Sequence, residues 1–367
     1  MPKVCLCMIV KNESKIIERC LNSVKPIMDS LFIVDTGSTD NTVELIKNFI
    51  RIKLSPAKGF VVSRPWKNFE HNRNEAIKLA KAHCIEADYL YFIDADEELI
   101  VGDPEEWKTL EKDAYLVNYN FGELKYPRIS LVKARQNWHY LGVLHEYLTL
   151  DTPYTTGTIN QSHVHVRPEG ARSTDPNKFL NDAQVLRDAL LTEPNNERYQ
   201  FYLAQSLKDA ELPEAAIIEY EKRISMGGWI EEVWYSYYQI GKLREYLPGS
   251  NPETIIYDYL KAINYRPSRA EAYGRLAKFL RSKEHFTLAC SFAEQGMKLP
   301  MTEDKLFLEP AYYKWMCRDE YAVSGYWCGK YLEAATINEQ LLADGFIPEH
   351  EKGRIQDNLK FCLEKLR

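Results

Sequence analysis

The stretch 92–98, which reads FIDADEE, contains the residues whose types and spacing point most directly to chemistry. It continues the apolar run 89–93 and places four carboxylates within five residues. Two close carboxylates, here Asp94 and Asp96, suit Mg²⁺ or Mn²⁺, which completes its coordination shell with water and substrate phosphates. We therefore expect this Asp-x-Asp motif to bind a metal, with Asp96 the stronger ligand, and the substrate to carry a diphosphate. The alternative is a turn whose acids face water.

The apolar pattern predicts the elements that must position these acids. Apolar runs predict strands at 4–10, 31–34, 59–63 and 89–93, and helical spacing predicts helices at 13–24, 42–50 and 70–83. This alternation is typical of an α/β domain with a largely parallel sheet. Ligands bind at the carboxyl ends of the strands in such sheets, so we expect the chemistry in the loops 11–13, 35–40 and 94–98.

The region after the acidic loop gives three further expectations. Glu97 and Glu98 fit the cap and first turn of a following helix. Tyr126-Pro127 is expected to form a turn. Further strands are expected at 114–121, 128–133 and 142–150.

Asp35 is a second candidate, because it ends the second strand at the same edge. Its carboxylate could accept a hydrogen bond from a nucleotide base or a ribose hydroxyl, and we favour this role. The alternative is a turn residue beside Gly37. Ser38, Thr39 and Asp40 are expected to cap the next helix.

Histidines gather after the acidic loop, with positions 139, 145, 163 and 165 falling within 27 residues. One of them, His165 or else His163, is expected to ligate the metal, although a lone histidine is usually structural. Glu146 is the expected general base, since a carboxylate can deprotonate a hydroxyl that attacks a sugar carbon. The alternatives are that Glu146 pairs with an arginine or faces water.

Composition excludes other classes of protein. The 47 Lys and Arg against 53 Asp and Glu give a net charge of −6, so we expect no nucleic acid partner. No segment approaches the roughly 18 consecutive apolar residues that a membrane span needs. The apolar run 4–10 is too short for a signal peptide. We therefore expect no transmembrane segment and a cytoplasmic location.

The second half of the chain has a different texture, with helix following helix. The prolines of "EPNNERYQFYLA" and "RPSRAEAYGRLA" are 73 residues apart, and half of that is close to the 34-residue tetratricopeptide period. The spacing predicts domains at 1–172 and 173–367, the second an all-α solenoid that could bind a protein partner. An unrelated helical bundle is the alternative.

The motifs "CLCMIVKNESKIIERCLNSV", "LFIVDTGSTDNTVELI", "HNRNEAIKLA" and "YFIDADEEL" together resemble family 2 glycosyltransferases. The segments after residue 170 resemble the subgroup that carries tetratricopeptide-like helices. The resemblance implies a Rossmann-like GT-A domain, a nucleotide-diphosphate sugar donor, a divalent metal and usually inversion at the anomeric carbon. It implies that the nucleoside contacts Val10, Lys11, Glu13 and Asp35, the diphosphate contacts Arg73, Asp94 contacts the ribose or the metal, and Asp96 binds the metal. Thr36 departs from the commoner Asp-Asp pair at this position, which puts the base contact in doubt.

These observations predict a metal-dependent glycosyltransferase of the hexosyltransferase type that uses Mn²⁺ or Mg²⁺. We expect a UDP-sugar donor, a protein or glycan acceptor, and one in-line displacement with Glu146 as base. A nucleotidyltransferase would show a glycine-rich loop where this chain has "VKNESK". A protein-binding scaffold with an inactive transferase-like domain is the other alternative.

Overall fold

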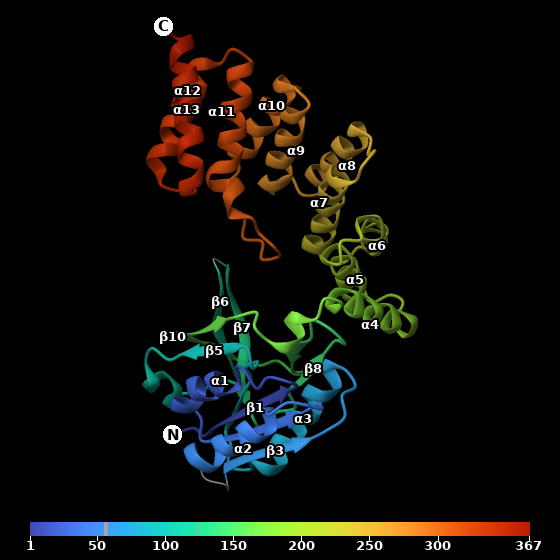
Figure 1. Ribbon diagram of the computed structural model, residues 1–367, viewed down its shortest axis with the longest axis vertical. Helices are drawn as coiled ribbons and strands as arrows, with labels where there is room; N and C mark the ends of the chain where they lie inside the picture. The colour runs from blue at the N-terminus through green and yellow to red at the C-terminus, as the bar shows by residue number, and fades with distance from the viewer. Residues whose placement is uncertain (55–57, 123) are drawn as a thin grey trace. The chain divides into compact units, whose positions relative to one another are not determined.

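The computed structural model describes residues 1–54, 58–122 and 124–367. The chain forms two compact units, Met1–Ala189 and Leu190–Arg367. The first combines a sheet with flanking helices, and the second consists of helices (Figure 1). The predicted order, an α/β domain followed by an all-α domain, is confirmed.

The first half of the sheet has the alternating order that the sequence predicts. Strands β1 (Val4–Val10), β2 (Ser30–Asp35), β3 (Gly59–Ser63) and β4 (Tyr89–Tyr91) pair in parallel in the order β3-β2-β1-β4. The connecting helices are α1 (Ile17–Val24), the 3-10 turn η1 (Lys25–Ile27), α2 (Thr42–Lys53) and α3 (Phe69–His83). Strands β1, β2 and β4 are buried on both faces, because α1 and α2 pack on one face and α3 packs on the other, whereas β3 at the edge is only partly buried. The carboxyl ends of β1, β2 and β4 therefore meet at one edge.

The remaining strands continue the sheet in the order β7-β6-β10-β5, which makes it mixed. They are β5 (Glu97–Ile100), β6 (Ala114–Phe121), β7 (Leu124–Lys133) and β10 (Thr156–Val166). Strand β7 pairs antiparallel with both β4 and β6, and β10 runs antiparallel to β5. A separate ladder pairs β8 (His139–Leu141) with β9 (Tyr147–Thr149), and short 3-10 turns occur at η3 (Pro104–Lys108) and η4 (Ala171–Thr174).

Three local predictions in this region are wrong. Glu97 and Glu98 belong to β5 rather than to a helix, because pairing with β10 takes up their backbone and Glu97 is buried. Tyr126 and Pro127 lie inside β7, where the proline is tolerated opposite Asn118 of β6. Only Tyr147–Thr149 of the expected strand 142–150 is extended, since Gly142 and His145 adopt φ of 111° and 52°.

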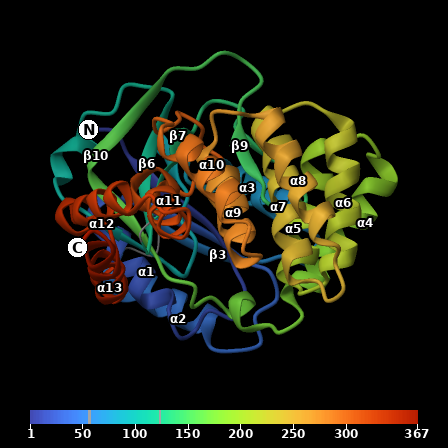
Figure 2. The same cartoon turned by 90° about the horizontal axis from the view of Figure 1, so that it is seen from above.

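The second unit is a run of antiparallel helical hairpins (Figures 1 and 2). After α4 (Lys178–Thr192), the helices are α5 (Glu197–Asp209), α6 (Pro213–Met226), α7 (Ile230–Tyr246), α8 (Pro252–Tyr265), α9 (Ala270–Ser282), α10 (Phe286–Met297), the π-helical turn η5 (Tyr312–Met316), α11 (Cys317–Trp327), α12 (Tyr331–Asp344) and α13 (Glu349–Lys365). Starts of α5, α7, α9 and α11 differ by 33, 40 and 47 residues (230 − 197, 270 − 230, 317 − 270). The predicted hairpin repeat is present, with a longer connection before α11.

The boundary between the compact units falls at 189/190, within α4, later in the chain than the predicted 172/173. The physical reason is that η4 and the start of α4 are attached to the first unit. Arg172 of η4 pairs with Asp182 of α4, and its guanidinium lies 4.7 Å from the Phe69 ring of α3.

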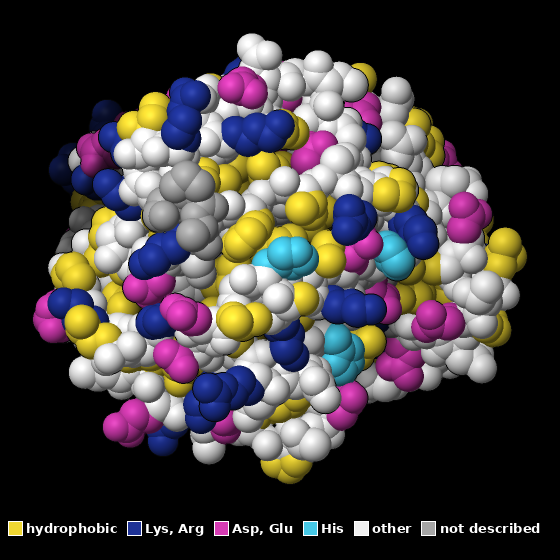
Figure 3. Space-filling model, turned by 90° about the horizontal axis from the view of Figure 1, so that it is seen from below, with side chains coloured by type: hydrophobic (Ala, Val, Ile, Leu, Met, Phe, Trp, Pro, Cys, Tyr) yellow, Lys and Arg dark blue, Asp and Glu magenta, His cyan; other side chains and the backbone are white. Residues whose placement is uncertain are grey.

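The surface and the helices bear on two expectations from composition. On the face shown in Figure 3, basic and acidic side chains are interspersed. Within the part of the chain that the structure describes, no helix is both long enough and apolar enough to cross a bilayer.

Candidate active site

The loops after β1 and β2 are bound to each other by side chains of the second loop. The Asn12 amide donates to Ser38 Oγ at 2.8 Å, and the Glu13 amide donates to Thr42 Oγ1 at 2.8 Å. In return, Asn12 Oδ1 accepts from the Thr39 amide at 2.7 Å. The sequence had suggested that Ser38 and Thr39 cap α2. In the structure they join the two loops instead. In the first of these loops Lys11 is exposed, and Val10 is buried at the end of β1.

Asp35 is buried at the end of β2, and its carboxylate stabilises its own turn. It accepts hydrogen bonds from the Gly37 amide at 3.2 Å and from the Ser38 amide at 3.1 Å. Gly37 has φ of 106°, a conformation that favours glycine. The structural role of Asp35 is therefore visible, and its contact with a nucleotide stays a prediction.

Arg73 connects two of the predicted site acids that are far apart in the sequence. From α3, its Nη2 donates to Asp94 Oδ1 at 2.8 Å and its Nε donates to Glu146 Oε1 at 2.6 Å. Arg73 and Glu146 side chains are each only 12% exposed. The structure thus brings Arg73, Asp94 and Glu146 together, and it supplies the arginine pairing that was one alternative for Glu146.

The loop that carries Glu146 is fixed to α3 by further bonds. Asn74 donates to the Tyr140 carbonyl at 2.9 Å and accepts from the Tyr140 amide at 2.7 Å. The Gly142 amide donates to Glu70 Oε2 at 2.9 Å. Contacts from Glu70, Arg73 and Asn74 of α3 therefore position the loop of Glu146 beside the end of β4.

Arg128 is a site residue that sequence reasoning missed. Its Nη2 donates to Glu97 Oε2 at 2.8 Å and to the Tyr119 hydroxyl at 2.7 Å, and its Nη1 lies 3.8 Å from Asp94 Oδ2. The guanidinium also lies 3.9 Å from the Tyr119 ring centroid. The available signal was an arginine at the start of the predicted strand 128–133, but only the antiparallel pairing of β7 with β4 places it beside Asp94.

The electrostatics of these acids differ. Burial acts to raise the pKa of Asp94, but the charges of Arg73 and Arg128 outweigh it and hold that pKa below its ordinary value. Burial raises the pKa of Glu97 to about 7, against the effect of Arg128. The Asp94 carboxylate is therefore ionised and shared between two arginines.

Asp96 and Glu13 approach the same stretch of backbone. The Ala171 amide donates to Glu13 Oε2 at 3.2 Å. A Cβ placed on Gly170 would lie 3.0 Å from Asp96 Oδ2 and 3.5 Å from Glu13 Oε1. Burial raises the pKa of both carboxyls, to about 7 for Glu13, and neighbouring acids add to the shift. Two carboxylates beside a residue without a side chain form a donor set that suits a hard cation.

The predicted histidine ligands are on β10, whose end is near Asp96. His165 pairs in register with Glu98 and His163 with Ile100, and the Arg167 amide that follows donates to the Asp96 carbonyl at 3.2 Å. Among residues 1–54, 58–122 and 124–367, no three His, Cys, Asp or Glu side chains form a group that could hold a metal. The case for a metal at this site therefore depends on the Asp96 and Glu13 carboxylates, and a histidine ligand stays a prediction.

Parts of the chain are similar to known proteins. Residues 5–141 match the family Glycosyl transferase family 2. A TPR repeat-containing protein of Synechococcus elongatus is 32% identical over 158 residues, which are 40% of this chain and 35% of that protein. The SPbeta prophage-derived glycosyltransferase SunS of Bacillus subtilis is 39% identical over 97 residues, which are 26% of this chain and 20% of SunS. The chain thus spans about a third or less of the length of these relatives.

Solved structures also resemble part of the chain. The crystal structure of MamA is 18% identical, with a TM-score of 0.35, over 52% of this chain and 89% of that one. A TM-score this low adds nothing to the helical hairpins described above. The residues that match glycosyltransferase family 2 thus include most of the sheet of the first unit and its strand-end acids, and a run of helical hairpins follows them in this chain.

Proposed function

We propose that this chain transfers a sugar from a nucleotide-diphosphate donor, specifically a UDP-sugar, to an acceptor with inversion of the anomeric carbon. The observation that carries the proposal is the Arg73 bridge between Asp94, at the strand end where donors bind in such sheets, and Glu146. The buried guanidinium of Arg73 therefore fixes Asp94, on the donor side, relative to Glu146, the candidate base.

The donor side is proposed to include a divalent metal. Asp96 would bind this metal, and Glu13, which approaches the same Gly170, would provide a second carboxylate. Asp94 would contact either the ribose or the metal. Mn²⁺ or Mg²⁺ bound there would neutralise the charge that builds on the departing diphosphate, an effect worth several kcal/mol. Val10, Lys11 and Asp35, at the ends of β1 and β2, are proposed to contact the nucleoside.

The acceptor side is proposed to use Glu146 as the general base. Its carboxylate would accept the proton of the attacking acceptor group while that group bonds to the anomeric carbon and the bond from this carbon to the phosphate oxygen breaks. The nucleoside diphosphate leaves with the electron pair of the broken bond. A single displacement of this kind inverts the anomeric centre and needs no covalent intermediate.

The proposal is tested by incubating the full chain with a panel of nucleotide sugars and Mn²⁺ and measuring released nucleoside diphosphate. We expect release from a UDP-sugar that stops when a chelator removes the metal. Glu86→Gln is a suitable control, since that side chain is 75% exposed and pairs with Lys3 away from the site. Absence of release from every donor, with and without metal, would contradict the proposal.

A further inference from the structure

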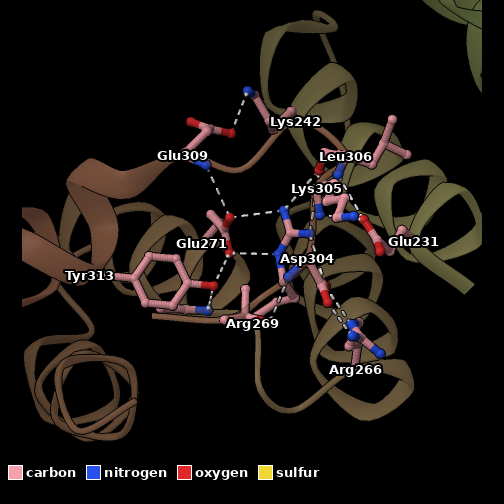
Figure 4. Close-up of polar contacts among 12 residues, drawn as sticks. Glu231, Lys242, Arg266, Arg269, Glu271, Asp304, Lys305, Leu306, Glu309 and Tyr313 are labelled. Carbon is pink, nitrogen blue, oxygen red and sulfur yellow. Dashed lines mark hydrogen bonds and ion pairs between the residues drawn. The ribbon is translucent and has the colours of Figure 1, made fainter. Parts of the chain in front are cut away.

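Residues 299–309 connect α10 to the helix that begins before η5, and they contain no helix or strand. This connection is the longest between successive helices of the second unit. Its second half, residues 304–309, lies against side chains of α5, α7 and the start of α9, and we call it the strap (Figure 4).

The first anchor of the strap is Asp304. Arg266 Nε donates to Asp304 Oδ2 at 2.6 Å, and Arg266 Nη2 pairs with the other carboxylate oxygen. Arg269 Nη1 donates to Asp304 Oδ2 at 3.2 Å. Arg269 is fully buried between Glu271, at 2.9 Å, and the ring of Trp234, whose centroid is 3.8 Å away. Two arginines thus form a preformed receptor for one carboxylate.

The second anchor is the strap backbone, which helix side chains recognise directly. The amides of Lys305 and Leu306 both donate to Glu231 Oε2, at 2.8 and 2.7 Å. The Glu309 amide donates to Glu271 Oε1 at 3.2 Å, and the Leu306 carbonyl accepts from Arg269 Nη1 at 3.4 Å (Figure 4). Contacts of this kind hold a main chain in place and do not depend on the side chains that it carries.

The third anchor is the ring of Phe307. Its centroid lies 4.8 Å from that of Tyr235 on α7 and 6.4 Å from that of Phe201 on α5. The residue has φ of 44°, which a bulky side chain rarely adopts, so the surrounding contacts hold the backbone there.

The strap combines polar anchors with a ring that is only partly buried. Phe307 is 43% exposed, and its ring packs on Phe201 and Tyr235, which are themselves buried. The other contacts described above are polar and come from side chains outside the strap. A second segment that carries the same groups could therefore replace the strap contact for contact.

We propose that this surface binds a segment of another protein that follows the same course as the strap, and that the strap occupies the surface in the free chain as an internal competitor. The strap site consists of Phe201, Glu231, Tyr235, Arg266, Arg269 and Glu271. The partner segment carries an acid followed three residues later by an aromatic residue, as Asp304 and Phe307 do. This inference does not rest on sugar transfer, so its test is a binding experiment that stands whatever the catalytic result.

The test uses a fluorescent peptide with the sequence of residues 300–310, PMTEDKLFLEP, and the full chain. In the double variant Asp304→Asn/Phe307→Ala the competitor is weakened. Apparent affinity is reduced by the fraction of sites that the strap occupies, so we expect this variant to bind the peptide at least about tenfold more tightly than the native chain. Glu231→Ala added to it should weaken binding again, because the two backbone amides lose their acceptor.

Matched controls separate occupancy from general loosening. Asp357→Asn/Phe361→Ala changes an acid and a half-exposed aromatic residue on α13, outside the strap site, and should bind the peptide as the native chain does. A peptide with Lys in place of the Asp should not bind. Hydrogen exchange of the unmodified chain adds a readout without mutation, since excess peptide should speed exchange at the amides of 305, 306 and 309. Equal affinity of the native chain and the strap variant, binding of the Lys peptide, or no binding at all would overturn the proposal.

Discussion

At the scale of single residues, the carboxylates around the end of β4 have separate environments. Asp94 faces two arginines, Glu97 is buried against Arg128, and Glu98 pairs with Arg167 at 3.1 Å. Asp96 instead faces Glu13 across Gly170. This division makes Asp96 the clearest candidate for a metal ligand and leaves Glu146 as the carboxylate on the acceptor side.

Asp96→Asn should abolish metal-dependent binding of a nucleoside diphosphate while the domain still folds. The amide loses the negative charge that attracts a divalent cation and leaves the size of the side chain unchanged. Isothermal titration with UDP and Mn²⁺ measures the effect, and circular dichroism checks the fold. Unchanged affinity in this variant would remove Asp96 from the metal site.

Glu146→Gln should lower the rate of transfer by ~10² to 10⁴-fold, the usual contribution of a general base, and leave donor affinity unchanged. The product of the native chain should have the anomeric configuration opposite to that of the donor, which NMR of the product establishes. Transfer by the variant at the native rate would exclude Glu146 as base. Asp151, whose side chain is 84% exposed, would then be the next carboxylate to test.

At the scale of elements, the site depends on how neighbouring strand ends and loops are held together. The turn at 170–171 brings the Ala171 amide to Glu13, and the pairing of β7 with β4 brings Arg128 to Asp94. These contacts join residues that are far apart along the chain, so changes in the backbone of a loop should act on the site.

Gly170→Ala should weaken binding of the Mn²⁺–UDP pair without unfolding the domain. The added methyl group would lie 3.0 Å from Asp96 Oδ2, so the carboxylate must move. Titration calorimetry gives the affinity. Gly353→Ala in α13, where a Cβ would meet nothing within 4 Å, is the matched control and should bind as the native chain does. Equal affinity of the two variants would show that the two carboxylates need not converge at Gly170.

Asp113 gives a prediction on pH. It accepts bonds from the Thr155 hydroxyl and amide, from Lys133 and from Gln136, and these bonds hold its pKa below the ordinary value of 3.8. A carboxyl with a depressed pKa stabilises the fold above its unfolded pKa, and this contribution is lost as pH falls through the folded value. Asp113→Asn should therefore lower the melting temperature at pH 7, and the difference from the native chain should shrink below about pH 4. A difference that stays constant with pH would contradict this assignment.

At the scale of the whole molecule, the chain divides into two compact units. Some apolar clusters lie within residues 4–164 of the first unit, and others lie within residues 270–362 of the second. Units that each contain apolar clusters of their own can unfold in separate cooperative steps.

We therefore expect calorimetry of the full chain to show two unfolding transitions. A ligand stabilises only the unit that binds it, so Mn²⁺ with UDP should raise the temperature of one transition and leave the other unchanged. Asp96→Asn should show no such shift. A single transition, or equal shifts of both, would mean that the units unfold as one.

The sequence by itself determined the order of elements and which loops carry the acids. Local apolar spacing is enough for this, because each strand and helix of residues 4–93 buries a face that its own residues define. The resemblance of its motifs to family 2 glycosyltransferases likewise needed only contiguous residues, as did the helical period after residue 190. Single residues such as Asp94, Asp96 and Glu146 could be selected because they stand out against their neighbours in the chain.

Only the tertiary structure decided how these residues meet. Arg128 reaches Asp94 through antiparallel pairing. Arg73 pairs with Asp94, 21 positions later, and with Glu146, 73 positions later. Asp96 and Glu13 both approach Gly170. Glu97 and Glu98 became strand residues because pairing with β10 outweighed their fit to a helix start. The position of the strap also depends on tertiary structure. The residues of α5 and α7 that it contacts are about 70 to 106 positions earlier in the chain, and no local pattern encodes these contacts.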